Sequence, residues 1–148
     1  MTTTKSTTAT VLASRISPWR SAGLWLTGLL LAYILFSSVR AATDPSAFAA
    51  TFGLPLGNAG DSSFVLVYAV RALFLGILGL TLLARRHYSS LAMFILAATI
   101  MPIGDALLVF RNGAGPATIG LHVSIGLILL LTWYLLQRWI RQTAVRQD

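Results

Sequence analysis

The chain of 148 residues contains no cysteine and only 4 acidic residues, and each shortage excludes a class of protein. Without cysteine the chain can form no disulfide, no thiolate metal site and no cysteine nucleophile. Charged residues make up 10% of the chain, whereas soluble domains average roughly 25%, so the surface of an ordinary soluble domain could not be covered. The hydrophobic fraction of 56% also excludes an intrinsically disordered chain.

Long apolar runs dominate what is present. Four of them reach the roughly 20 residues that a membrane-spanning helix needs, and they cover about residues 19–39, 62–84, 89–110 and 116–140. The runs are long and lack period-two alternation, which disfavours strands. We therefore predict an all-α integral membrane protein with four transmembrane helices in an up-down-up-down bundle. Residues 1–18 are predicted to form a disordered, Thr-rich tail, and residues 141–148 a basic tail.

The net charge of +7 is distributed as in a membrane protein. The cations lie at the ends of the apolar runs and not on one face of a soluble fold, so we expect no nucleic-acid partner. Alternating spans would place eight lysine and arginine residues on one side of the membrane and two, Arg40 and Arg111, on the other. By the positive-inside rule, both termini are predicted to be cytoplasmic.

Two segments leave alternatives open. Val39-Arg40-Ala41 resembles a signal-peptide cleavage site, and the acid-free first 43 residues share the composition of a transit peptide, so processing competes with an uncleaved first helix. The connection at residues 42–61 is long and has an apolar middle, FAATFGLPL. It either lies at the membrane interface or folds back over the bundle as a lid, or it is an ordered loop without a role.

Three ionisable residues lie inside the predicted spans, where charge is costly: Arg71, Asp105 and His122. Arg71 lies ten residues after Asp61, about 15 Å along the helix. Asp105 and His122 each lie six residues from the nearer end of their span, about 9 Å along it. All three of these ends are on the predicted outer side, so the residues are expected at similar levels in the outer half of the bilayer.

Two interpretations of these residues remain open. In the structural one, Arg71 and Asp105 neutralise each other and fix the helix register, and His122 hydrogen-bonds a neighbouring carbonyl. In the functional one, the three side chains line a pocket that is open to the outer leaflet. Asp105 and His122 would then act as general acid and base, and Arg71 would hold a developing oxyanion.

Three further residues are candidate ligand-binding residues. Tyr68 lies three residues before Arg71, Thr118 lies four before His122, and Asn112 lies in the turn before the fourth span. Pro102 is predicted to kink the third span beside Asp105. One aspartate and one histidine in the membrane are too few for a metal site, and no cofactor is expected.

Four segments, AFAATFGLPL, VYAVRALFLGILGL, MPIGDALLVFRNG and IGLHVSIG, together resemble a family of small four-span membrane proteins of bacteria and fungi that is catalogued as a domain of unknown function. The resemblance covers roughly residues 25–137, and the family motifs correspond to residues 52–55, Arg71, residues 102–105 and His122. In many relatives an acidic residue follows the arginine, whereas Ala72 stands here, which weakens any mechanism that needs two carboxylates. The resemblance implies a four-helix membrane fold and the same three polar residues, without an established activity.

Three functions follow from these observations. The first is a membrane enzyme that acts on a lipophilic small molecule by acid/base isomerisation, cyclisation or hydrolysis, as a step of a biosynthetic pathway. The second is a binder or transporter of a hydrophobic or anionic compound, with Arg71 as the anion contact. The third is an accessory subunit in which the polar residues are structural. The expected partners are the lipid bilayer and a lipophilic small molecule, and homo-oligomerisation is an open alternative.

Overall fold

The computed structural model describes residues 21–144, and every regular element in this range is helical. The long helices are α1 (Ala22–Thr43), α3 (Ser62–Ala84), the consecutive pair α4 (Tyr88–Ala98) and α5 (Ile100–Arg111), and α6 (Pro116–Ala144). A short helix, α2 (Pro45–Phe52), and a 3₁₀ turn, η2 (Ala59–Asp61), lie between α1 and α3. The tail predicted at residues 1–18, the predicted start of the first span and residues 145–148 lie outside the described range.

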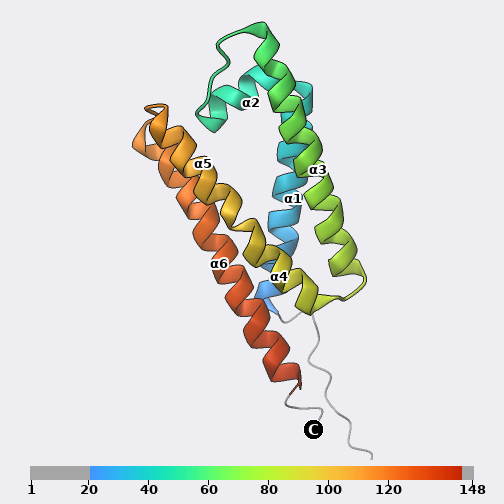
Figure 1. Ribbon diagram of the computed structural model, residues 1–148. Helices are drawn as coiled ribbons and strands as arrows, with labels where there is room; N and C mark the ends of the chain where they lie inside the picture. Colours follow the sequence, from blue (N-terminus) through green and yellow to red (C-terminus); the bar gives the residue numbers. More distant parts are fainter. Residues whose placement is uncertain (1–20, 145–148) are drawn as a thin grey trace, which may run out of the picture.

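Four helical segments are long and apolar enough to cross a membrane, with α4 and α5 counted as one span. Large hydrophobic side chains point outward from them, and Phe64, for example, is 77% exposed. Such surfaces are stable only when lipid or another apolar partner covers them. The all-α prediction is confirmed, and the four apolar helices indicate an integral multi-pass membrane protein. Figure 1 shows the successive long helices running in opposite directions, with the start of α1 and the end of α6 at the same end of the molecule.

Helix α2 interrupts the connection between the first two spans, and local signals define it. The Asp44 carboxylate accepts a hydrogen bond from the backbone N–H of Ala47 at 2.9 Å, and Pro45 occupies the first helical position. Gly53 ends the helix with a φ of 98°, a left-handed conformation that favours glycine. The segment thus folds back over the bundle, as one of the sequence interpretations proposed.

The third span is interrupted beside Pro102, as predicted. In a continuous helix the carbonyl of Ala98 would accept a hydrogen bond from the backbone N–H of residue 102, which proline lacks. Helix α4 ends at Ala98 and α5 begins at Ile100. The Thr99 hydroxyl between them donates a hydrogen bond to the Leu96 carbonyl at 2.7 Å.

The helices pack as two pairs, α1 with α3 and α5 with α6, which meet at one end of the molecule and diverge at the other. Small residues allow the close approaches: Gly76 and Gly79 of α3 face Leu35 and Leu31 of α1. At the closed end, Leu91, Ala92, Ile95 and Leu136 form a buried cluster between α4 and α6. At the open end, α2 lies between the two pairs (Figure 1).

We expect Gly23→Ala to destabilise the fold, because a Cβ at Gly23 would lie 2.9 Å from the backbone nitrogen of Leu136 and would force α1 and α6 apart. Overpacking of this kind costs about 1–3 kcal/mol. Gly28→Ala in the same helix is the matched control, because a Cβ there has no neighbour within 4 Å. Thermal unfolding in lipid nanodiscs would compare the two, and an equal effect of both changes would contradict the close α1–α6 packing.

Candidate functional site

A cavity of about 170 Å³ lies beneath α2, between the two helix pairs. Its lining is mostly apolar, with side chains of α1, α3, α4, α5 and α6 below and of α2 above. The polar side chains that line it are those of Thr27, Tyr33, Ser37, Arg40, Thr51, Tyr68, Asp105 and His122. Every long helix of the bundle therefore contributes to this one space.

Helix α2 is held over the cavity by an aromatic cluster and one hydrogen bond. The Nε2 atom of His122 lies 3.1 Å from the backbone oxygen of Phe52, and the two rings meet edge to face at 4.6 Å between centroids. A carbonyl oxygen can only accept, so Nε2 carries the proton and donates it. The ring of Tyr68 lies 5.0 Å from that of Phe48 and 5.9 Å from that of Phe52. These contacts connect α2 to α3 and α6.

His122 is 4% exposed and is fixed by this hydrogen bond. Its contact with a backbone carbonyl agrees with the structural interpretation for this residue, although the carbonyl belongs to α2 and is 70 positions away in the chain. Its imidazole still lines the cavity. The histidine therefore holds α2 in place over the cavity, and its own ring also lines the cavity.

Asp105 presents its carboxylate to the cavity. It interacts electrostatically with His122 and with Tyr68, but within residues 21–144 it accepts no hydrogen bond and forms no ion pair. A carboxylate in a mostly apolar space needs a donor or an opposite charge to offset its desolvation. The carboxylate is thus available to a molecule that enters the cavity.

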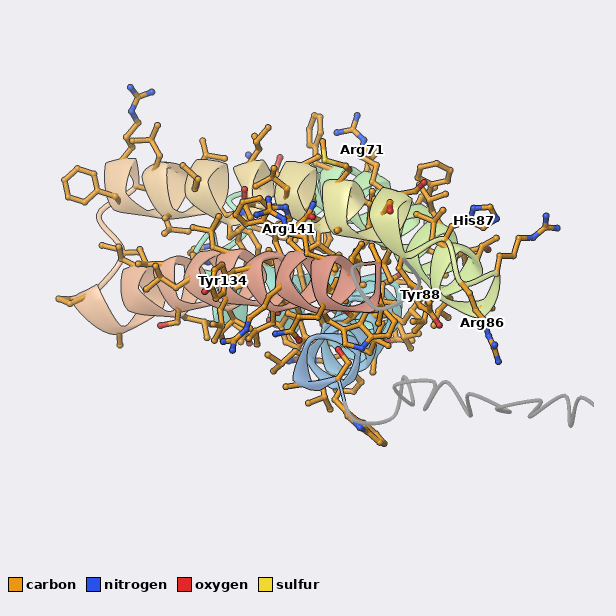
Figure 2. All side chains as sticks on the ribbon, turned by 90° about the horizontal axis from the view of Figure 1, so that it is seen from below. Arg71, Arg86, His87, Tyr88, Tyr134 and Arg141 are labelled. Carbon is orange, nitrogen blue, oxygen red and sulfur yellow. The ribbon has the colours of Figure 1, made fainter. Side chains whose placement is uncertain are left out.

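The prediction that Arg71 shares a pocket with Asp105 and His122 is wrong. Arg71 is exposed, does not line the cavity and forms no ion pair in the described part of the chain. Figure 2 shows its side chain projecting away from the bundle. The reason is rotation about the helix axis: α3 turns Ala72 into the bundle, and the preceding residue points about 100° away.

Arg40 of α1 lines the cavity instead, and the sequence analysis missed it. The first span was predicted to end at residue 39, whereas α1 continues to Thr43. Arg40 is therefore part of the helix, one turn beyond Ser37 and two turns beyond Tyr33. The spacing of these three polar residues, four and then three positions, places them on one helical face, and that signal could have identified the site.

The three candidate ligand-binding residues also differ in whether they line the cavity. Tyr68 lines the cavity, whereas Thr118 and Asn112 do not. Thr118 directs its methyl group at Gly53, at the end of α2. Asn112 is exposed, and its side-chain amide donates a hydrogen bond to the Leu108 carbonyl at 2.9 Å, which caps α5. The structure thus brings together Tyr68, Asp105 and His122, and places the remaining three candidates elsewhere.

No group of three or more metal-ligating side chains occurs within residues 21–144. The cavity has one carboxylate and one imidazole, and the imidazole nitrogen Nε2 already donates to Phe52. The side chains that line the cavity can form hydrogen bonds, transfer protons and contact a charged group.

A family model described as a domain of unknown function (DUF4267) matches residues 31–136. The chain belongs to this family. The match spans more than two thirds of the chain and includes Tyr33, Arg40, Tyr68, Asp105 and His122 of the cavity. No curated protein and no solved structure matches the chain. The resemblance to a four-span family of unknown function is thereby confirmed, and the family description assigns no activity.

We expect His122→Phe to loosen α2, because phenylalanine keeps an aromatic ring beside Phe52 but removes the donated hydrogen bond. A hydrogen bond contributes about 1 kcal/mol, so amide hydrogen exchange in residues 45–54 should rise about fivefold. His87→Phe is the matched control, since His87 is exposed in the turn between α3 and α4 (Figure 2). Unchanged exchange in His122→Phe would show that the hydrogen bond does not hold α2 in place.

Proposed function

We propose that this protein binds a lipophilic small molecule within the membrane, in the cavity beneath α2. The observation that carries the proposal is the Asp105 carboxylate, which faces a mostly apolar cavity and has no hydrogen-bond donor within residues 21–144. Apolar walls with a few convergent polar groups are typical of small-molecule sites. A ligand that donates a hydrogen bond to Asp105 would offset the cost of placing this carboxylate in the cavity.

The position of Arg71 supports binding over a purely structural role. If the polar residues served only to neutralise one another, Asp105 would be expected beside an arginine. Arg71 faces outward, and Arg40 lines the same cavity as Asp105 without forming an ion pair with it. The two opposite charges in one cavity are therefore both available to a bound molecule.

Acid/base catalysis on the bound molecule is the second candidate function. Asp105, Tyr68 and His122 all line one cavity, and each can carry a transferable proton. In an isomerisation, the Asp105 carboxylate would take a proton from a carbon next to a carbonyl, and the electron pair would move to the carbonyl oxygen. Tyr68 would donate a hydrogen bond to this oxygen. Where a carbon–carbon double bond is conjugated with the enolate, Asp105 would return the proton to the far carbon of that system as the carbonyl re-forms. An enzyme of this class would serve a biosynthetic pathway, whereas a binder, transporter or accessory subunit would need only the cavity.

We also propose that the start of α1 and the end of α6 face the cytoplasm. Arg85, Arg86, Arg138 and Arg141 belong to the end at which α1 starts and α6 finishes, and Arg40 and Arg111 belong to the end that carries α2 (Figure 1). The larger number of cations favours the first end as the cytoplasmic one. The cavity would then lie in the outer half of the bilayer, and α2 would cover it on the outer side.

The binding proposal predicts that Asp105→Asn lowers the amount of a lipophilic small molecule that co-purifies with the protein, because the amide lacks the negative charge that attracts a donor. Organic extracts of the purified variants would be compared by mass spectrometry. Asp44→Asn is the control, because it removes the same charge outside the cavity and asparagine also caps a helix. Identical extracts from the wild type and Asp105→Asn would contradict the proposal.

The orientation predicts the labelling of single cysteines, which this cysteine-free chain allows. In intact cells, a membrane-impermeant maleimide should label Asn58→Cys, in the exposed segment after α2, and should spare His87→Cys. The second site should react only after the membrane is permeabilised. The reverse pattern would place the termini on the outer side.

A further inference from the structure

We infer that the molecule bound beneath α2 is a compact amphiphile about the size of one substituted ring, with a hydrogen-bond donor at Asp105 and its apolar body at the deep end of the cavity. This inference rests on the proposed binding function and names the ligand's size, polarity and orientation. Three properties of the cavity carry it: its volume, the distribution of its polar groups and the kind of polar atom that it presents.

The volume limits the size of the ligand. A dry cavity of about 150 Å³ in another protein binds benzene, and the cavity beneath α2 measures about 170 Å³. The space therefore holds a single ring with a short substituent. A membrane phospholipid with two acyl chains is too large to be enclosed in it.

The distribution of polar groups sets the orientation. Arg40, Asp105 and His122 lie toward the helix ends that are covered by α2. Phe94 and Ile95 lie at least ten residues before Asp105 in the third span. The helical rise over ten residues is about 15 Å, so these two side chains line the cavity far from α2. Leu31 of α1 and Leu129 of α6 line the same deep part of the cavity. A molecule with one polar end would therefore place this end beneath α2 and its apolar body among the deep side chains.

The polar atoms that are available identify the ligand's polar end as a donor. The Asp105 carboxylate, which lines the cavity, can only accept hydrogen bonds when ionised. The donor Nε2–H of His122 already serves the Phe52 carbonyl. Arg40 is exposed at the end of α1, whereas Asp105 is partly buried, so the carboxylate is the more deeply placed of the two charges. An ammonium or hydroxyl group matches this arrangement better than a carboxylate.

Fluorine NMR would test this inference with three single-ring probes on the protein in phosphatidylcholine nanodiscs, with empty nanodiscs as the reference. The probes are 4-fluorobenzylamine, 4-fluorotoluene and 4-fluorobenzoate, which share a ring and differ in the polar group. We expect the amine to bind at least tenfold more tightly than the other two. Asp105→Asn should remove most of this preference, and Asp44→Asn should retain it.

A second pair of variants tests the position of the ring. Ala98→Leu would fill part of the cavity and should weaken the binding of 4-fluorobenzylamine severalfold, because Ala98 lines the deep half. Ala97→Leu adds the same volume on the exposed side of α4 and should have no effect.

Any of three results would overturn the inference and leave the binding function standing. If 4-fluorobenzoate or 4-fluorotoluene binds as tightly as the amine, the donor is wrong, and if Ala98→Leu and Ala97→Leu bind alike, the orientation is wrong. If no probe binds beyond the empty nanodiscs, the single-ring size is wrong. The co-purification experiment decides the binding function separately, because it does not depend on any chosen probe.

Discussion

The contact between Phe52 and His122 connects α2 to the bundle, and the arrangement of the cavity depends on it. At the open end the two helix pairs diverge. Without α2, the space between them would be open to the surroundings. The hydrogen bond of 3.1 Å and the edge-to-face ring contact fix the C-terminal end of α2 on α6. Phe48 and Tyr68 extend the contact to α3. A cavity with one polar, covered end results from these few side chains.

The four spans could be predicted from the sequence because burial in lipid requires long apolar runs, whatever the packing. The ends of the helices were less accurate, since they depend on capping and not on hydropathy. The error at residue 39 mattered, because it removed Arg40 from the first helix and from the candidate site. Helix α2 was described only as an apolar connection, although Asp44-Pro45 and Gly53 are recognisable start and stop signals.

The depth of a polar residue could also be predicted, whereas its direction could not. Asp105 and His122 were expected at one level and do line one cavity with Tyr68. Arg71 was placed with them by depth alone, but the rotation of α3 is set by the close approach of Gly76 and Gly79 to α1. Apolar residues of α3 occupy every face of this helix, so its sequence did not reveal which face points into the bundle. Only the packing of small residues against α1 determines that Arg71 faces outward.

The central claim is that α2 lies over the cavity as a fixed lid. Electron–electron distance measurements between spin labels on Ala50→Cys of α2 and Ser124→Cys of α6 test it most directly in lipid, because both positions are exposed and the chain has no other cysteine. The account predicts one narrow distribution at short distance, which broadens when His122 is also replaced by phenylalanine. A broad or long distribution in the protein with native His122 would contradict it, since α2 would then lie away from the bundle.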